Sequence, residues 1–328
     1  MTYLQHKNVS NNFEQNLRDI IYKDLSLSQN QINDFNVMNF IQVLGIHKEY
    51  KSRLILPKKY QVNISKELQT KINQNDFEEK DTVPKLNNLI NKLQNAEDII
   101  PHLSRSVKDK QYNDALYNDW KIYHLHLGVN IESDGYVERT KNVLFVMKDN
   151  NNIYLIDILS HGNGNLPWTK KSLLEIVDNN WSFLLDSSDL GSGVSPVTTY
   201  DESEHYKLRK NDINVITSIN GRTLMPINLG VTLAGTSVMT HIISMSLIRH
   251  LEFFHNFVVN NYQQIAEFLK MENIILEVKL YNPDDLNIKF SIANSDVVIY
   301  IQATEKRIIT RISFIKKNLQ KELYFTFG

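Results

Sequence analysis

The spacing of apolar residues in the first third of the chain predicts helices joined by loops. In NNFEQNLRDIIYKDL, residues 11–25, apolar side chains recur at helical spacing. The segment VPKLNNLINKLQNAEDIIPHL, residues 83–103, repeats Leu and Ile with a similar period. The sequence therefore predicts a mainly helical N-terminal region over residues 1–109.

The pattern changes to that of strands in the centre of the chain. If WKIYHLHLG, residues 120–128, is a strand, its successive side chains point to opposite faces, with leucines on one face and histidines on the other. The segment VLFVMKDNNNIYLIDILSH, residues 143–161, has two apolar runs separated by KDNNN. Such an interruption predicts a β-hairpin. LPWTKKSLLEIVDNNW, residues 166–181, then has the spacing of a short amphipathic helix. We expect residues 110–190 to form a compact α+β unit, an antiparallel sheet with helices on one face.

Residues 191–328 are predicted to form a C-terminal α+β domain. The chain from 186 to 235 is rich in turn residues and predicts irregular structure. A long helix should follow from about 236 to 269, and its first half is apolar almost all round, which predicts burial. The run from 274 to 314 predicts a four-stranded antiparallel meander with turns at NPDD, NSD and TEK. The predicted fold class is α+β.

Composition and charge limit the classes of function. A hydrophobic fraction of 42% and a charged fraction of 22% are typical of a globular protein. The formal net charge of -1 gives no overall attraction to nucleic acid or membrane, so such binding needs a local patch. The absence of cysteine excludes disulfides, thiolate metal sites and cysteine catalysis.

Neither a signal peptide nor a membrane span is predicted from the hydropathy of the chain. MTYLQHKNVSNNF at the N-terminus has no apolar run of the signal-peptide kind. The longest apolar region, residues 238–259, carries too many polar groups for a spanning helix. We therefore expect a cytoplasmic protein with no membrane partner.

The pair His124 and His126 is the strongest candidate for chemistry. On a strand, alternation places Ile122, His124 and His126 on one face and Leu125 and its neighbours on the other. The leucine face has the pattern of a core. Burying both imidazoles without partners would cost roughly 1–3 kcal/mol each, which favours a functional role for the pair.

The hairpin brings further candidates toward the same end of the sheet. Asp157 and His161 share one side of its second strand with Ile153 and Leu155, and Arg139 precedes its first strand. If the three strands are adjacent, His124, His126, Arg139, Asp157 and His161 converge. Tyr123 and Trp168 are candidates for the walls of a pocket, and Arg209 and Arg222 are candidate phosphate-binding cations. Asp119, next to Trp120, is a candidate to orient a histidine.

Three chemistries fit these residues. In metal-free phosphodiester cleavage, one histidine is the base, a second is the acid and Arg139 stabilises the charged phosphorane. In metal-assisted hydrolysis, His124 and His126 are ligands from one strand, and His161 and Asp157 complete a site that keeps an open position. In nucleotidyl transfer of the histidine-triad type, one histidine attacks phosphorus, but that family's repeat of alternating histidines is broken here by Gly128.

The central unit resembles the RelE and barnase-like bacterial toxin endoribonucleases in the order of its parts. Those parts are a strand with histidines, an arginine before the next strand, an acidic and Asn-rich hairpin, and a strand ending in DILSH. The resemblance covers roughly residues 110–185. It implies a sheet face that cleaves RNA without metal, with His124, His126, Arg139 and His161 as the matching positions, and a role in host growth or phage defence.

The sequence thus leads to one principal expectation and two alternatives. The principal one is a metal-independent endoribonuclease, a hydrolase that needs no cofactor and binds RNA. A toxin-like protein of this kind has an antitoxin or a host factor as its protein partner. The alternatives are a histidine-ligated metallohydrolase, and a non-catalytic regulatory or anti-defence binding protein whose histidines hold a polar network.

Overall fold

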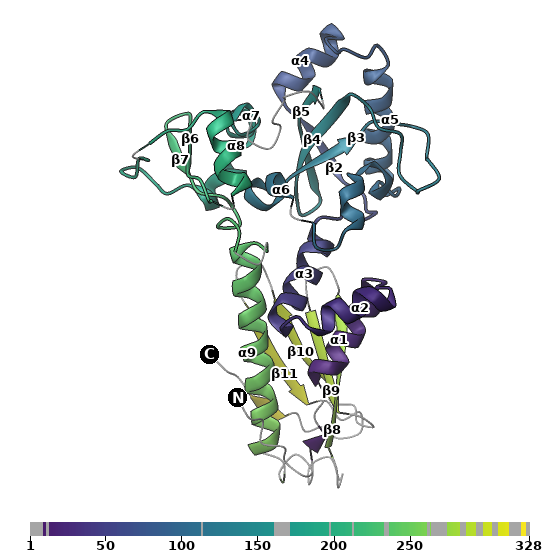
Figure 1. Cartoon of the computed structure of the whole chain (residues 1–328), viewed down its shortest axis with the longest axis vertical. Helices are drawn as coiled ribbons and strands as arrows, with labels where there is room; N and C mark the ends of the chain where they lie inside the picture. The colour runs from purple at the N-terminus through teal and green to yellow at the C-terminus, as the bar shows by residue number, and fades with distance from the viewer. Residues whose placement is uncertain are drawn as a thin grey trace. The chain divides into compact units, whose positions relative to one another are not determined.

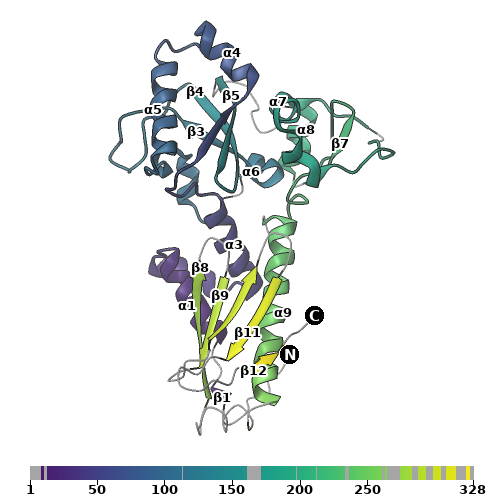
Figure 2. The same cartoon turned by 180° about the vertical axis from the view of Figure 1, so that it is seen from behind.

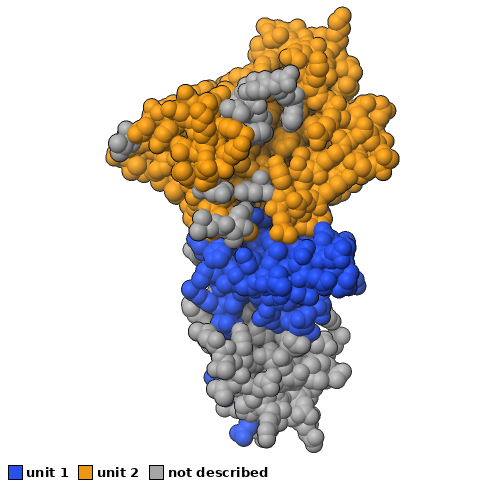
Figure 3. Space-filling model, in the orientation of Figure 1, with its two compact units in different colours: residues 1–51, 240–328 blue, residues 52–239 orange. Residues whose placement is uncertain are grey.

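The computed structural model describes most of the chain as two compact units. Unit 1 comprises residues 1–51 and 240–328, and unit 2 comprises residues 52–239 (Figure 3). The described residues are 9–10, 13–112, 114–160, 171–196, 198–211, 213–232, 236–260, 263, 274–282, 287–292, 298–303, 308–314 and 323–325.

Unit 1 combines helices with one sheet. The helices are α1 (Phe13–Asp24), α2 (Gln29–Asn36), α3 (Phe40–Ser52) and α9 (Val238–Asn260). The strands are β1 (Val9–Ser10), β8 (Ile274–Asn282), β9 (Asn287–Ile292), β10 (Val298–Ala303), β11 (Ile308–Phe314) and β12 (Leu323–Phe325). The strands lie in the order β1-β8-β9-β10-β11-β12, antiparallel except for the β1–β8 pair. Helices α1, α3 and α9 lie on the same face of this sheet (Figures 1 and 2).

The predicted C-terminal meander and long helix are both confirmed. Strands β8 to β11 pair consecutively and antiparallel, as the alternating pattern predicted. The predicted turns at NPDD, NSD and TEK fall mostly outside the described residues. Helix α9 begins at Val238, close to the predicted start, and is described to Asn260. Among the described residues, no helix is long and apolar enough to cross a membrane.

Unit 2 is built around a four-stranded sheet. Its strands are β2 (Gln61–Ile64), β3 (Ile122–His126), β4 (Asn142–Asp149) and β5 (Asn152–Ser160), and a separate pair is formed by β6 (Thr217–Ile219) and β7 (Arg222–Leu224). Its α-helices are α4 (Lys66–Gln74), α5 (Thr82–Gln94), α6 (Ala115–Trp120), α7 (Lys171–Trp181) and α8 (Glu202–Lys210). Among the described residues, 3₁₀ helices cover Ile100–His102, Arg105–Lys108 and Ser182–Ser188.

The strand order is β2-β5-β4-β3, so the three predicted strands are adjacent and antiparallel. The hairpin reverses at Asn150, which lies in the left-handed backbone region that asparagine tolerates. The fourth strand, β2, was not predicted, and it pairs with β5 in parallel. The fold class is α+β, as predicted, but the central sheet is mixed rather than purely antiparallel.

A β-bulge in β5 changes which side chains share a face. Phe145 pairs with Asp157 and Val146 with Leu155, so Ile156 is the extra residue. The prediction that Asp157 shares a face with Ile153 and Leu155 is therefore wrong. The bulge places Asp157 on the face that carries His124 and His126.

Helices pack on both faces of the sheet, whereas the sequence predicted helices on one face. Figures 1 and 2 show the sheet between α5 and α7. On the histidine face, Leu173, Leu174 and Val177 of α7 share a core cluster with Ile122 and Phe145. The opposite face is also buried, with Leu125 fully enclosed. The histidine pair therefore lies beside a core rather than on an open sheet.

The compact units do not follow the boundaries predicted at residues 109/110 and 190/191. Strand β2 and helices α4 and α5 come from the predicted N-terminal region, yet they pack with the central sheet. Helices α1 to α3 belong instead with the C-terminal sheet. The physical reason is that β2 completes a sheet edge with residues about ninety positions away, which a local pattern does not report.

Gly128 ends the histidine strand because the chain passes close to it. A Cβ added at this position would overlap the carbonyl oxygen of Glu138. That contact explains why the alternation of histidines stops at a glycine.

We expect Gly128→Ala to lower the free energy of unfolding of unit 2 by about 1–3 kcal/mol, because backbone must shift to admit the methyl group. Ser133→Ala, at an exposed position in the same loop, is the control and should change it by less than about 0.5 kcal/mol. Urea unfolding followed by tryptophan fluorescence measures both, since all three tryptophans lie within residues 52–239. Equal stability of the two variants would contradict the close approach.

Candidate functional site: the histidine strand of unit 2

His124 and His126 lie side by side on one face of β3, as predicted. Their ring centroids are 6.4 Å apart, with the rings at 78° to each other. The His124 side chain is 18% exposed, whereas His126 is 6% exposed. Solvent therefore reaches the pair mainly at His124.

A carboxylate from the preceding helix faces His124. Asp114 caps the N-terminus of α6, where its Oδ1 accepts a hydrogen bond from the Tyr117 backbone N–H at 3.1 Å. Its Oδ2 lies 3.9 Å from His124 Nδ1. Because α6 leads directly into β3, the same short segment supplies both groups.

His102 secures the end of β3. Its Nδ1–H donates to the His126 carbonyl oxygen at 2.8 Å, and Lys92 Nζ donates to its Nε2 at 3.1 Å. This arrangement requires the neutral ring. Burial also lowers the pKa of His102, so the imidazole stays neutral in solution near pH 7. No local pattern predicts this role of His102, because the contact spans 24 residues.

Asp157 lies on the histidine face, but its carboxylate already forms an ion pair with a lysine. Lys71 Nζ of α4 lies 2.8 Å from both carboxylate oxygens, and the Ile158 backbone N–H donates to Oδ1 at 2.8 Å. The Asp157 carboxylate is buried, so the ion pair neutralises it and fixes α4 on the sheet. Lys71 is a residue that sequence reasoning missed, since nothing local couples it to Asp157.

Arg139 lies close to the end of the histidine strand, as predicted. The Leu127 backbone N–H donates to Oγ1 of the adjacent Thr140 at 3.2 Å, which holds this segment beside β3. Arg139 is exposed. No ion-pair partner for its guanidinium occurs within the described part of the chain. His161 and Trp168 lie outside the described residues, so their predicted roles stay predictions.

Tyr123 lies on the opposite face of β3 and cannot form a wall for the histidine pair. Its hydroxyl donates to the Ser52 carbonyl oxygen at 2.7 Å, and its ring contacts Tyr117 with centroids 4.9 Å apart. Strand alternation, which separates Tyr123 from His124, is the physical reason.

Arg209 is held in a buried ion pair rather than presented to a ligand. Its Nε and Nη2 bind the two carboxylate oxygens of Asp119 at 2.6 and 2.7 Å. Burial raises the pKa of Asp119 to about 6, while the charge of Arg209 opposes that shift. Asp119 was predicted to orient a histidine, and its partner is instead this arginine.

Arg222 is likewise surrounded by carboxylates. Its guanidinium contacts Asp178 at 2.7 Å, Asp189 at 2.8 Å and Asp186 at 2.9 Å. These hydrogen bonds raise its pKa further above the ordinary arginine value, despite partial burial. With three acidic partners, Arg222 is not available as the predicted phosphate-binding cation.

The described side chains do not form a metal site. Within that part of the chain, no group of three or more His, Asp or Glu residues is arranged to hold a metal ion. The predicted alternative site of His124, His126 and His161 includes a residue outside the described set. Two of its three predicted ligands, His124 and His126, are described, and both lie on β3.

Comparison with known proteins adds no family to this geometry. No family model matches the chain, and no curated protein and no solved structure is similar enough to it to count as a match. The function must therefore be argued from the side chains themselves.

We expect Arg209→Met to lower the free energy of unfolding of unit 2 by about 3–5 kcal/mol, because the Asp119 carboxylate is left buried without its partner. The double variant Asp119→Leu/Arg209→Met removes both charges and should recover most of that loss. Arg139→Met, at an exposed arginine, is the control. Urea unfolding followed by tryptophan fluorescence reports all three, and a double variant no better than Arg209→Met would contradict the ion-pair interpretation.

His205 on α8 gives a pH-dependent prediction. Burial, assisted by the charges of Arg209 and Lys171, lowers its pKa from 6.5 to about 4. Above pH 6.5 the ring is neutral in both the folded and the unfolded state, so its full contribution to stability is present. Between pH 6.5 and about 4 only the unfolded state takes up the proton, and stability falls as pH falls.

We expect this loss to reach up to about 3 kcal/mol in the free energy of unfolding. The variant His205→Gln should lose correspondingly less stability between pH 7.5 and 4.5, while other titrating groups such as Asp119 affect both proteins equally. Urea unfolding at the two pH values measures the difference. Parallel pH curves for the two proteins would show that His205 does not titrate as described.

Proposed function

We propose that this chain is a metal-independent endoribonuclease in which His124 and His126 transfer the protons. The observation that carries the proposal is the placement of two imidazoles on one strand face with their centroids 6.4 Å apart. We place the phosphate at the solvent-exposed side of the pair, near His124, where each ring would bond to a different oxygen.

The reaction requires two proton transfers. One neutral imidazole removes the proton from a ribose 2′-hydroxyl, and the 2′-oxygen forms a bond to phosphorus. The bond from phosphorus to the 5′-oxygen breaks, and the second imidazole, protonated at the start, gives its proton to that oxygen. The products are a 2′,3′-cyclic phosphate and a 5′-hydroxyl. Two histidines suit these roles because an unperturbed imidazole titrates near neutral pH.

The surroundings of β3 support a preorganised pair. Asp114, 3.9 Å from His124 Nδ1, favours the tautomer that leaves Nε2 for the substrate. His102 holds the His126 carbonyl, so the strand cannot shift easily beneath its side chains. A proton-transfer group held in this way loses little conformational entropy on reaching the transition state.

Arg139 supplies the positive charge that the reaction needs. It is exposed, it lies near the end of the histidine strand, and no described side chain neutralises it. A guanidinium at this place would bind the phosphate oxygens and stabilise the charge of the phosphorane. Lys71 is less suited, because Asp157 already neutralises it.

The test is cleavage of an RNA oligonucleotide in the presence of a chelator. His124→Ala and His126→Ala should each slow cleavage by roughly 10²–10⁴-fold. His241→Asn, a change to a half-buried histidine of unit 1, is the control for a general effect of losing an imidazole. Thermal unfolding of each variant shows whether the fold is intact.

Three results would overturn the proposal. Equal cleavage of a substrate with a 2′-deoxy nucleotide at the cut site would exclude attack by the 2′-oxygen. Loss of all activity in chelator, with recovery on adding a divalent cation, would favour the metal-dependent alternative. Destabilisation of the fold by the double variant His124→Ala/His126→Ala, with no cleavage by the wild type, would favour a structural role for the pair.

A further inference from the structure

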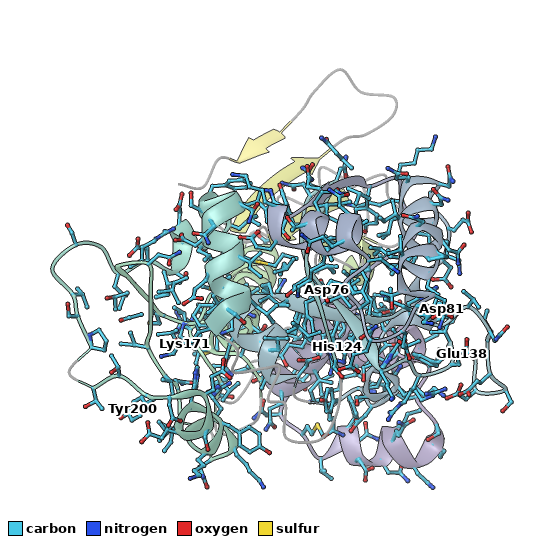
Figure 4. The ribbon with its side chains drawn as sticks, turned by 90° about the horizontal axis from the view of Figure 1, so that it is seen from above. Asp76, Asp81, His124, Glu138, Lys171 and Tyr200 are labelled. Atoms are coloured by element: carbon cyan, nitrogen blue, oxygen red, sulfur yellow. The ribbon has the colours of Figure 1, made fainter. Side chains whose placement is uncertain are left out.

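A small pocket lies between α7, α8 and β6, and none of the residues that line it belongs to the histidine strand. Its polar lining consists of Lys171, Thr199, Tyr200, His205, Thr217 and Ser218. The cavity has a volume of about 10 Å³, about what a single water molecule or the oxygen end of a larger group requires. Figure 4 shows Lys171 and Tyr200 on one side of unit 2, away from Asp81 and Glu138.

A buried hydroxyl of this pocket has no hydrogen-bond partner within the described chain, and a buried histidine lines the same pocket. Thr217 is 2% exposed, and its Oγ1 has no partner. His205 is 4% exposed. Buried polar groups are normally hydrogen-bonded, so the unpaired Thr217 hydroxyl indicates that a ligand group binds it.

The charge around the pocket is positive. Lys171 Nζ donates to the Tyr200 carbonyl oxygen at 2.8 Å, which holds the ammonium group at the pocket wall. Arg209 lies near His205, but Asp119 balances its charge. The acidic residues that begin α8 are exposed, and none of them lines the pocket. Lys171 therefore gives the pocket a net positive charge.

We propose that this pocket binds the oxyanion end of a small ligand, a carboxylate or a phosphate. The Thr217 hydroxyl and one ring N–H of His205 donate hydrogen bonds to its oxygens, and Lys171 supplies the opposite charge. The positive charge of Lys171 disfavours a cation, and a neutral carbonyl ligand would leave this ammonium group without an opposite charge. The proposal does not depend on the nuclease activity of β3.

The first experiment measures binding by the full chain to three probes, inorganic phosphate, acetate and neutral acetamide, at constant ionic strength. A ligand that binds the folded state raises the unfolding temperature in a saturable way. We expect such a rise with phosphate or acetate and none with acetamide. Saturation by phosphate alone identifies a phosphate site, and saturation by acetate alone identifies a carboxylate site.

The second experiment separates binding from stability. Thr217→Val removes the hydroxyl at nearly constant volume and should weaken anion binding by roughly 10- to 100-fold, while Thr217→Ser should restore it. Without ligand, Thr217→Val should be at least as stable as the wild type, because the lost hydroxyl has no described partner. Lys171→Gln should also weaken binding, whereas Lys207→Gln, at an exposed position on α8, should not.

Two outcomes would overturn the proposal. The absence of a saturable effect with either anion would leave the pocket to water alone. Unchanged anion affinity in Thr217→Val and in Lys171→Gln would show that the anion binds elsewhere. If Thr217→Val fails to fold, Lys171→Gln against Lys207→Gln decides the question.

Discussion

The ion pair between Asp119 and Arg209 is the interaction on which the arrangement of unit 2 depends. Its two hydrogen bonds, at 2.6 and 2.7 Å, join α6 to α8 inside the unit. The Asp119 carbonyl oxygen also accepts from the Ile227 backbone N–H at 2.7 Å. Because α6 passes directly into β3, and because α8 carries His205, this one buried pair positions both proposed sites. Separating the two charges would leave each of them buried without a partner, so the pair holds α6 and α8 in a fixed geometry.

The histidine face of the sheet shows how polar groups are accommodated beside a core. His124, His126 and Asp157 lie on the same face as Ile122 and Phe145, which α7 covers. Two of these side chains have a charged neighbour from another segment, since Asp114 faces His124 and Lys71 neutralises Asp157. His102 instead holds the backbone of the strand through the His126 carbonyl. A face built in this way is rigid, and rigidity is what proton transfer between fixed groups requires.

The two proposed sites use different physical means. On β3, two like side chains are placed together and a nearby exposed arginine supplies charge. In the pocket of α7, α8 and β6, a buried hydroxyl without a described partner and a buried histidine lie where a lysine supplies charge. The first arrangement suits proton transfer and the second suits recognition of an anion. Both lie within unit 2.

The sequence by itself determined the local elements and which residues of β3 share a face. Alternation along residues 122–126 follows from strand geometry, so His124 and His126 had to be neighbours once the segment was extended. The β4–β5 hairpin, the long helix α9 and the meander of β8 to β11 follow equally from periodicity and turn residues. Strand β2 was not predicted, because four residues are too few to show the two-residue repeat of a strand.

Only the tertiary structure decided what those residues contact. The bulge at Ile156 reverses the face of Asp157, because one extra residue shifts a two-residue repeat. Arg209 binds Asp119, 90 positions away in the sequence, and Lys71 binds Asp157, 86 positions away. Both contacts depend on tertiary packing rather than on a local sequence pattern. Helix α7 covers the histidine face, because the apolar residues between the polar ones there still have to be buried. The sequence thus identified the histidine pair, and long-range packing assigned its partners.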